Sequence, residues 1–338
     1  MKSITIRDIA QAAGVSPSTA FRALNDQNLV KPATRAKVIA AQQMLENEMS
    51  IPKEKTRITK SVGIIVPVST AHDLSGRPSM FTMIGSFLSE LSSNGIGNTM
   101  LVFDEKSMSI SDLLRETMDG YLVADTSEDQ ENVIIPALSN AALPCVLVNR
   151  RADAPFVSSV NIDDKTACAD AADYLISLGH RRIAFLGGRK NYQNTKRRLL
   201  GYQQALQNAG LSFNEEYAMF GDYSETSGYT MSDALLRMSP RPTAVICASD
   251  PIAIGCMHRL KDASLSLPGD CSIIGFGDIE SCRLVSPTLT TIAQPSRDLG
   301  AIAAKTLIQM MNYPVLINQQ LMLQTKLIIR ESTAAPLK

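Results

Sequence analysis

Residues 5–25 read TIRDIAQAAGVSPSTAFRALN, and this stretch carries the signals of two short helices joined by a tight turn. Thr5 is a favourable N-cap residue, and Asp8 follows three positions later, as in a capping box. Apolar and small residues then recur at helical spacing: Ile6, Ile9, Ala10 and Ala13. This spacing predicts a first helix with one buried face. Gly14 permits the positive φ that a turn directly after a helix requires.

A serine followed by a proline indicates a second helix, because the hydroxyl can cap the first amides and proline has no amide to satisfy. We expect this helix to run from Pro17 to about Leu24. Its inward face is small or apolar: Ala20, Ala23 and Leu24. Its outward face carries Pro17, Ser18, Phe21 and Arg22. Two short helices with glycine in the turn are typical of a helix-turn-helix, whose second helix enters the major groove of DNA.

The same stretch resembles the DNA-binding signature of the lactose-repressor (LacI/GalR) family of bacterial transcriptional regulators. The matching residues form a long motif without gaps: Asp8, Ile9, Ala10, Ala13, Gly14, Val15, Ser16, Thr19, Arg22 and Asn25. The resemblance implies a DNA-binding head. The alternative is a small helical hairpin that only packs on a larger domain.

Base reading by such a head falls to the outward residues of the second helix. Arg22 is the strongest candidate, because a guanidinium can bond guanine O6 and N7 together; its alternative is a phosphate contact or an exposed charge. Phe21 contacts a thymine methyl or a sugar, or it packs on the neighbouring helix. Thr5, Ser16 and Thr19 are expected to donate to phosphates and fix the register. The complete predicted DNA-binding set is Thr5, Ser16, Pro17, Ser18, Thr19, Phe21, Arg22 and Asn25.

The charge of the chain is unevenly distributed, although its formal net charge is zero. Residues 1–60 contain ten Lys or Arg and five Asp or Glu, so this part carries +5 and the remainder carries −5. The N-terminal part is therefore the one suited to a polyanion. The 338 residues, 45% hydrophobic and 20% charged, suffice for two or three compact units with a substantial core.

A third helix is predicted from Pro32 to residue 47, which completes a head of residues 1–47. Residues 48–61 are polar and basic, and we expect them to form a linker. In the family this region ends in a hinge helix that inserts a leucine into the minor groove. The chain lacks the corresponding Ala-Arg-x-Leu pattern, so we expect its allosteric coupling to depend less on such a helix.

From residue 62 onward, short apolar runs alternate with helical stretches, which predicts parallel sheets covered by helices on both faces. The expected strands are 62–67, 99–103, 120–125, 144–149, 182–188, 243–249 and 271–276. The expected helices are 80–94, 128–141, 164–178, 195–209, 227–238, 251–263 and 297–312. These strands are too many for one comfortable sheet. We therefore expect an α/β fold with two lobes and a cleft between them.

The resemblance extends over this region, through segments such as SLGHRRIAFLGG at 177–188 and IIGFGD at 273–278. It implies an effector-binding core, residues 62–332, related to periplasmic sugar-binding proteins, with crossovers between the lobes near residues 160, 288 and 322. Lobe one would comprise about 62–160 and 289–322, and lobe two about 161–288 and 323–332. The family's tetramerisation tail is absent after Ser332, so a homodimer is expected.

Five residues of this core are predicted to bind the effector: Phe81, Asp163, Arg198, Phe220 and Asp250. Arg198 and Asp250 match family positions that hold ligand hydroxyls or carboxylates. Asp250 and Asp163 each follow an apolar run, at the end of a strand where ligands bind in open α/β sheets. The alternatives are a structural ion pair for Arg198 and a helix N-cap for Asp250. Phe81 and Phe220 stack on a sugar or belong to the core.

The sequence indicates no metal, nucleotide or catalytic site. The six cysteines form no CxxC pair, which indicates buried thiols and no metal site. The histidines are scattered, and no nucleotide loop or catalytic signature stands out, so we expect neither a cofactor nor an enzyme. Basic pairs such as Arg150 and Arg151 are expected to be solvated. No apolar run approaches a membrane span and no signal peptide is visible, so a cytoplasmic protein without membrane contact is expected.

These features predict a transcriptional repressor of a carbohydrate-use operon. The partners would be double-stranded DNA with a palindromic operator and a second copy of the chain. A small-molecule effector in the cleft, a sugar or a sugar phosphate, would change operator affinity. The alternatives are a regulator with a purine effector, an α/β enzyme acting on a sugar phosphate, and a sugar receptor without DNA function.

Overall fold

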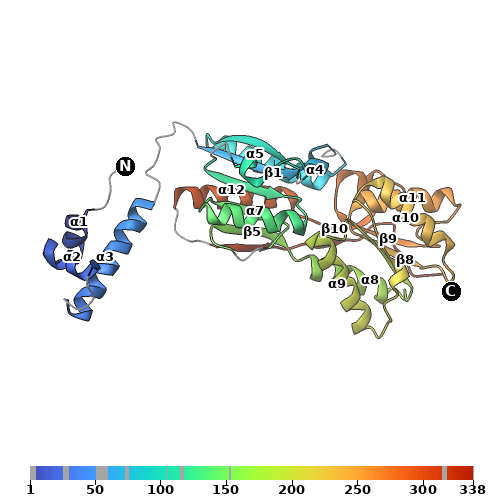
Figure 1. Cartoon of the computed structure of the whole chain (residues 1–338). Helices are drawn as coiled ribbons and strands as arrows, with labels where there is room; N and C mark the ends of the chain where they lie inside the picture. The colour runs from blue at the N-terminus through green and yellow to red at the C-terminus, as the bar shows by residue number, and fades with distance from the viewer. Residues whose placement is uncertain are drawn as a thin grey trace. The chain divides into compact units, whose positions relative to one another are not determined.

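The chain divides into two units, Met1–Ile58 and Thr59–Lys338, in this computed structural model. The structure describes residues 5–25, 30–50, 60–72, 76–104, 106–114, 118–151, 154–313 and 318–337, and Figure 1 labels their main helices and strands. The first unit is a helical head. The second is a core of two α/β lobes, which confirms the predicted fold class. The predicted linker, residues 48–61, lies largely outside the described residues.

The head consists of three helices: α1 Ile6–Ala13, α2 Pro17–Asn25 and α3 Pro32–Ser50. The predicted capping box is present, because the Thr5 amide donates to the Asp8 carboxylate at 2.8 Å and the Asp8 amide donates to Thr5 Oγ1 at 3.4 Å. Gly14 ends α1 with a left-handed φ of 62°. The three helices enclose a small core: Ile9, Ala10, Ala20, Ala23 and Val38.

Lobe one is built on a parallel sheet with the strand order β11-β5-β4-β3-β1-β2. Its strands are β1 Ser61–Pro67, β2 Gly97–Phe103, β3 Gly120–Ala124, β4 Cys145–Val148, β5 Val157–Ile162 and β11 Gln320–Leu323. Its helices are α4 Val68–His72, α5 Pro78–Ser93, α6 Ile110–Leu113, α7 Glu128–Asn140 and α12 Ser296–Asn312. Helices α5 and α12 pack together over one face of the sheet, and α7 packs on the other (Figure 1).

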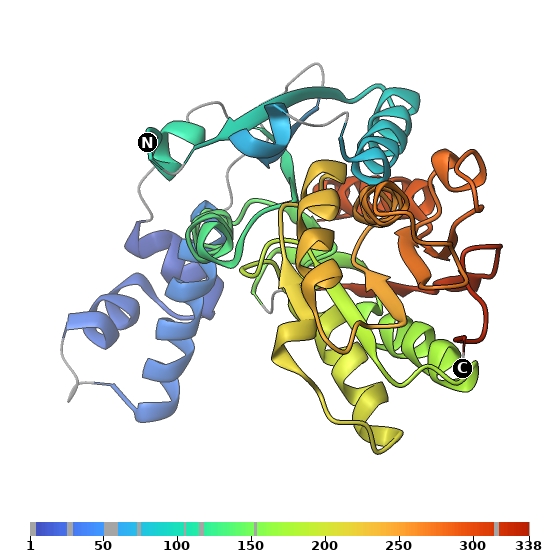
Figure 2. The ribbon, with the colours of Figure 1, turned by 90° about the vertical axis from the view of Figure 1, so that its right-hand side faces the viewer.

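Lobe two is built on a sheet with the strand order β12-β10-β9-β8-β6-β7, in which only β12 is antiparallel to its neighbour. Its strands are β6 Ile183–Gly187, β7 Ala218–Phe220, β8 Ala244–Cys247, β9 Ser272–Gly277, β10 Thr290–Ala293 and β12 Lys326–Ile328. Its helices are α8 Asp164–Ser177, α9 Gln193–Asn208, α10 Glu225–Arg237 and α11 Asp250–Asp262, with short turns η1 Glu215–Tyr217 and η2 Glu280–Arg283. Helices α8 and α9 cover one side of this sheet, and α10 and α11 cover the other (Figure 2).

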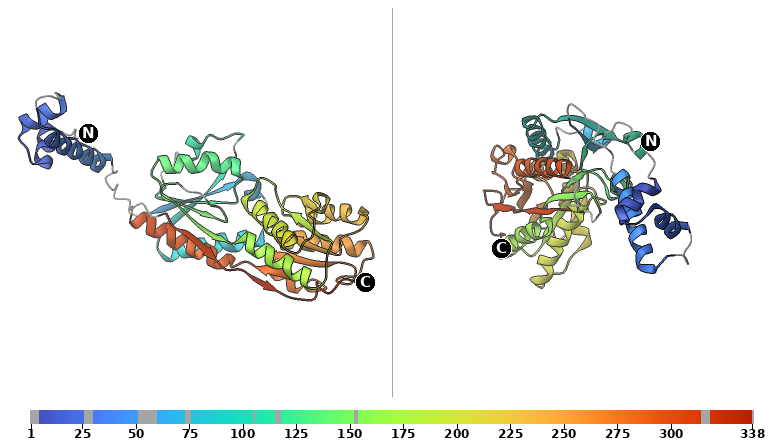
Figure 3. Two further views of the ribbon diagram at one scale, coloured as in Figure 1. Left: turned by 90° about the horizontal axis from the view of Figure 1, so that it is seen from below. Right: turned by 90° about the vertical axis from the view of Figure 1, so that its left-hand side faces the viewer.

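The chain passes between the lobes three times, after β5, after β10 and between β11 and β12. The second crossover, at 294–295, lies later than the expected position near 288. The reason is that β10 pairs with β9, so residues 290–293 belong to lobe two and not to lobe one. Helix α12 then lies along lobe one, and the chain runs from β11 of lobe one on to β12 of lobe two (left view of Figure 3).

Strand β2 differs from the sequence-based expectation, and five strands are absent from the predicted set: β5, β7, β10, β11 and β12. Strand β2 was expected to be buried on both faces, but it is the edge of its sheet, with Met100 and Val102 exposed by 42% and 37%. Strand β5 is absent from the predicted set, because its sequence VSSVNI mixes apolar residues with serine and asparagine. All six of its residues are nevertheless buried. Among the residues that the structure describes, no helix combines the length and apolar character that a bilayer span needs.

Two helical glycines make a matched test of this packing. A Cβ at Gly201 in α9 would lie 2.0 Å from the Lys165 carbonyl oxygen of α8, whereas nothing lies within 4 Å of a Cβ at Gly85 in α5. We predict that Gly201→Ala lowers the free energy of unfolding by about 1–3 kcal/mol. Gly85→Ala should raise it by about 0.5–1 kcal/mol, since alanine is the better helix former. Urea unfolding of both variants tests this, and equal effects would contradict the close approach of α8 and α9.

Candidate functional site

The outer face of α2 presents the side chains that the sequence analysis assigned to base reading. Ala20 and Ala23 are buried in the head core, while Pro17, Ser18 and Arg22 are exposed on the opposite side of the helix. Phe21 is 53% exposed, so it does not lie within the core of the head. Asn25 ends α2, and its side chain lies outside the described set. The helix therefore offers a polar face with one aromatic ring to a partner.

Hydroxyl groups cluster at the start of α2. Ser16 Oγ accepts from the Thr19 amide at 3.2 Å and lies 2.8 Å from Thr19 Oγ1 and 3.0 Å from Ser18 Oγ. Ser16 Oγ thus satisfies one of the first amides of the helix, and the three hydroxyl side chains remain exposed or half-buried. Arg35 of α3 points back to the end of α2, where its Nε donates to the Ala23 carbonyl at 3.3 Å. Arg35 therefore has a structural contact within the head.

A cavity lies between the two lobes, at the carboxyl ends of strands from both sheets. In each sheet the strand order reverses at one point: β2 and β3 lie on opposite sides of β1, and β7 and β8 lie on opposite sides of β6. Open α/β folds bind ligands at the carboxyl ends of the strands beside such a point. The cavity contains about 650 Å³ of empty space, part of it open to solvent. Lobe one lines it with Arg77, Ser79, Met83, Asp125 and Asn149 among others. Lobe two contributes Asn194, Arg198, Tyr223, Ser249 and Phe276, and the crossover contributes Gln294.

Each arginine of this cavity is already neutralised by a carboxylate. Arg77 pairs with Asp125, and both side chains are 9% exposed. Arg198 Nε lies 2.8 Å from the Asp164 carboxylate, and its guanidinium carbon lies 3.5 Å from the Phe276 ring centroid. The cavity therefore has almost no net charge to offer a ligand.

Two buried polar atoms of the lining have no hydrogen-bond partner among the described residues. They are Arg77 Nε, a donor, and Asn149 Oδ1, an acceptor. Asp125 and Asn149 also hold left-handed φ values of 56° and 58°. Such angles are uncommon outside glycine and cluster at functional sites, although Asp and Asn tolerate them best. One unsatisfied acceptor and two left-handed residues thus lie at the carboxyl ends of β3 and β4, and the unsatisfied Arg77 belongs to the pair with Asp125.

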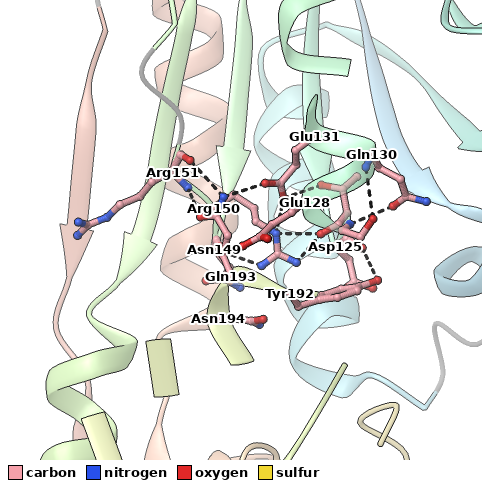
Figure 4. Close-up of polar contacts among 12 residues, drawn as sticks. Asp125, Glu128, Gln130, Glu131, Asn149, Arg150, Arg151, Tyr192, Gln193 and Asn194 are labelled. Carbon is pink, nitrogen blue, oxygen red and sulfur yellow. Dashed lines mark hydrogen bonds and ion pairs between the residues drawn. The ribbon is translucent and has the colours of Figure 1, made fainter. Parts of the chain in front are cut away.

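A polar network beside the cavity connects the lobes (Figure 4). Arg150, 1% exposed, lies 2.6 Å from Glu131 and donates to the Thr126 carbonyl. From lobe two, Gln193 donates to Glu131 at 2.9 Å, and the Tyr192 hydroxyl donates to the Asp125 carbonyl at 3.0 Å. Burial raises the pKa of Glu131, although Arg150 acts to lower it. The expectation that Arg150 is solvated is wrong, because the strand end it follows meets the other lobe.

Among the five predicted effector residues, only Arg198 lines the cavity. Asp250 is fully buried at the first turn of α11, where it accepts from the Thr291 hydroxyl and from the Ile279 amide at 3.0 Å. Burial raises its pKa, against hydrogen bonds that lower it. Asp163 caps α8 through the Thr166 amide at 3.4 Å and pairs with Arg197 at 3.1 Å, so the structure places it outside the cavity.

The two predicted aromatics also lie outside the cavity. Phe220 packs in lobe two, with its ring centroid 6.4 Å from that of Phe185 and 4.8 Å from Lys190 Nζ. Phe81 lies on α5, is 61% exposed and lines a groove beside the cavity. Asp125 and Asn149 are not among the predicted residues, although each directly follows an apolar strand, as Asp250 does. Nothing in the sequence pattern marked Arg77 or Gln294.

The part of the chain that the structure describes contains no cluster of three His, Cys, Asp or Glu residues able to hold a metal ion. All six cysteines are free and buried. Burial raises the pKa of the Cys168 thiol to about 12, which disfavours the reactive thiolate.

Sequence comparison connects this architecture to known proteins. The chain matches "Bacterial regulatory proteins, lacI family" over residues 5–46 and "Periplasmic binding protein-like domain" over residues 172–333. The HTH-type transcriptional regulator RegA of Clostridium saccharobutylicum is 32% identical over 97% of this chain and 99% of its own. The chain belongs to the lacI family of bacterial regulatory proteins. It is accordingly a DNA-binding transcriptional regulator, and the helix-turn-helix is its DNA-binding head.

Other lacI-family proteins are similar to this regulator over most of its length. The HTH-type transcriptional repressor CytR of Escherichia coli is 31% identical over 98% of this chain and 96% of its own. Among solved structures, the complex of the regulator CelR with cellobiose covers 98% of this chain and 100% of its own, with 27% identity and a TM-score of 0.75. A regulator from Enterococcus faecium with bound ribose covers 82% and 100%, with 28% identity and a TM-score of 0.72.

The network of Figure 4 makes a testable prediction about buried charge. Glu131→Gln leaves the buried Arg150 guanidinium without its carboxylate, and we expect it to lower the free energy of unfolding by about 3–5 kcal/mol. Glu128, on the same helix, pairs with Lys196 at the surface, with side chains 36% and 50% exposed. Glu128→Gln should therefore lower the free energy of unfolding by less than about 1 kcal/mol. Urea denaturation checks both variants, and a loss of similar size in the two would contradict the buried pair.

Proposed function

We propose that this lacI-family regulator is a cytoplasmic repressor of carbohydrate use that binds a palindromic operator as a homodimer. A neutral sugar in the cavity between its lobes would change its operator affinity. CytR is named as a repressor, and two structural neighbours contain sugars, which supports this assignment. The alternative effector classes, sugar phosphates and purines, become outcomes of the test below.

The observation that carries the proposal is the charge balance of the cavity. Arg77 and Arg198 are both paired with carboxylates, so a phosphate group would find no free positive charge there. A sugar instead supplies hydroxyl groups, each of which can donate and accept. Arg77 Nε needs an acceptor and Asn149 Oδ1 needs a donor. Both atoms are shielded from solvent in this arrangement, so a ligand bonds them only after their side chains rotate.

The cavity also contains apolar surface suited to the faces of a sugar ring. Met83 and Phe276 are buried beside it, and Tyr223 is held by hydrogen bonds to Thr195 and Asn194. Such a site, mostly apolar with a few oriented polar groups, is typical of small-molecule pockets. The polar groups then give specificity, because an analogue that lacks a hydroxyl leaves one of them unpaired.

Coupling to DNA follows from the position of the cavity between the lobes. A ligand that contacts both lobes favours the lobe arrangement in which those contacts form. Lobe one begins with β1, directly after the region that leads from the head. A change in the lobes of a dimer would therefore alter how the two heads fit successive half-sites. By linkage, operator DNA must change effector affinity by the same factor.

At the DNA end, we predict that Arg22→Ala removes selectivity at one base pair of each half-site. Loss of the bidentate contact should weaken the free energy of binding to the preferred operator by about 1–3 kcal/mol, while the fold stays intact. Selection from random half-sites measures the preference. The control is Lys37→Ala on the exposed side of α3, which should lower affinity for all sequences alike, if at all. An Arg22→Ala protein that selects the same sites as the wild type would refute the assignment.

At the effector end, we predict that a neutral sugar raises the melting temperature of the regulator, whereas its phosphate esters and nucleobases do not. At a hundredfold excess over its Kd, the sugar should add about 2.7 kcal/mol to the free energy of unfolding. Repeating the titration with operator DNA measures the coupling in both directions. Stabilisation only by a phosphate ester or a purine would contradict the neutral-sugar assignment and leave the DNA-binding role intact.

A further inference from the structure

The chain is held by a pair of reciprocal hydrogen bonds at the point where it enters lobe one. Lys60 and Ser61 are the first described residues after α3, which ends at Ser50. The Ser61 amide donates to the Asp119 carboxylate at 2.7 Å, and the Asp119 amide donates to the Ser61 carbonyl at 2.8 Å. We call these two bonds the entry clamp. Together they fix both polar groups of the Ser61 backbone.

The entry clamp lies at the end of the hydrogen-bonded ladder between β1 and β3. This ladder begins with Val62 opposite Gly120, and Asp119 directly precedes β3. The Asp119 side chain therefore supplies an acceptor one residue before the ladder begins. A hydrogen bond to an ionised acceptor is stronger than one between neutral groups. The carboxylate thus extends the hold on β1 by one residue toward its N-terminus.

Asp119 is itself fixed, because α12 packs against the start of β3. A Cβ at Gly120 would lie 2.9 Å from Leu307 Cδ1 and 3.1 Å from Met311 Sδ, so the helix contacts the β3 backbone directly. Leu307 is fully buried. Asp119 therefore holds Ser61 from a position that the core of lobe one determines.

Lys60 makes two further contacts beside the entry clamp. The Gly97 amide of β2 donates to the Lys60 carbonyl at 2.9 Å, and Lys60 Nζ donates to Asn312 at the end of α12. The Lys60 and Asn312 side chains are exposed, so water competes for the bond between them, whereas Asp119 is half-buried. The entry clamp is therefore the stronger hold that side chains provide at this point.

The position of this point matters for DNA binding, because only residues 51–59 connect α3 to Lys60. An extended residue spans at most about 3.6 Å, and successive base pairs lie about 3.4 Å apart along the duplex. Each residue freed at the entry clamp therefore gives a head the additional reach of about one base pair. Adding one base pair also rotates a half-site by about 35° around the duplex axis, so correct spacing is demanding.

We infer that Asp119 is a positioning residue for operator recognition. By holding the Ser61 amide, its carboxylate fixes where the chain leaves lobe one for the head, and so limits the half-site spacings that a dimer accepts. This inference rests on the proposed function, because it requires two heads of a homodimer on one palindromic operator.

Loss of the entry clamp should remain local. The six residues of β1 that follow Ser61 are all buried, and they pair with β2 on one side and with β3 on the other. Freeing Lys60 and Ser61 should therefore leave the sheet and the effector cavity in place. Its effect is a longer connection between head and core.

The test measures the operator affinity of the full-length regulator as a function of half-site spacing. The probes are duplexes with two copies of the half-site obtained by selection from random sequences, and their centre is shortened or lengthened by one to three base pairs. For the wild type, we expect a change of one base pair to lower affinity at least about tenfold, because both heads can no longer bind together without strain.

Two variants remove the two partners of the same bond. Asp119→Ala should reduce the penalty for one or two added base pairs to less than about threefold, because each head gains reach. Ser61→Pro removes the amide donor and should give the same broadened profile, since proline is accepted at the first residue of a strand. Both variants should keep the base preference of the wild type on a single half-site.

The matched controls are two further aspartate substitutions. Asp119→Asn retains an acceptor for the Ser61 amide, and Asp129→Ala removes an exposed aspartate from α7 of the same lobe. Both should keep the sharp wild-type profile. A purely structural role for Asp119 would lower affinity by the same factor at every spacing.

An Asp119→Ala protein with that uniform loss, or with the wild-type profile, would overturn the role of the entry clamp while the proposed dimeric regulator stands. A wild-type protein that is indifferent to half-site spacing would overturn both this inference and the proposed palindromic operator.

Discussion

Buried positive charge is the constraint on which the junction of the two lobes depends. Arg77, Arg150 and Arg198 lie almost completely out of contact with solvent, at the carboxyl ends of the two sheets. Removing a guanidinium from water costs several kcal/mol unless a carboxylate and further acceptors surround it. Each of the three therefore lies against an acidic side chain. The outcome is a cavity that is polar in its hydrogen bonding and nearly neutral in charge.

Part of the contact between the lobes is polar. Tyr192 and Gln193 of lobe two bond to a carbonyl and a carboxylate of lobe one, and water can replace such bonds when the lobes separate. Such bonds resist separation of the lobes less than buried apolar surface would.

The head is stabilised by a core of very few residues. Ala20 and Ala23 allow the three helices to approach closely, so a small core suffices and the outer face of α2 remains available for DNA. Arg35 connects α3 to the end of α2 through a bond to the Ala23 carbonyl. The proposed base-reading face is thus a short row of side chains, whereas the cavity is lined by residues from eight separate places along the rest of the chain.

The sequence by itself determined the local elements and the family. The capping box of Thr5 and Asp8, the turn at Gly14 and the doubly buried strands all follow from patterns within a few residues, because capping and helical or strand periodicity are local. Local patterns did not predict strand β5, because its buried serines and asparagine find partners only in the folded sheet. The later crossover at 294–295 likewise depends on the pairing of β10 with β9.

Which residues line the cavity depends on the tertiary structure. Arg198 could be found from its family position, and Asp125 and Asn149 carried the same signal as Asp250, a polar residue after an apolar strand. Whether such a side chain faces the cavity depends on the neighbouring strand. Gly275 and Gly277 of β9 have no side chains, so the Asp250 carboxylate packs against β9 and does not face the cavity. Arg77 and Gln294 reach the site from loops whose position no local pattern records. Their role exists only because two sheets, built from distant segments, bring their carboxyl ends together.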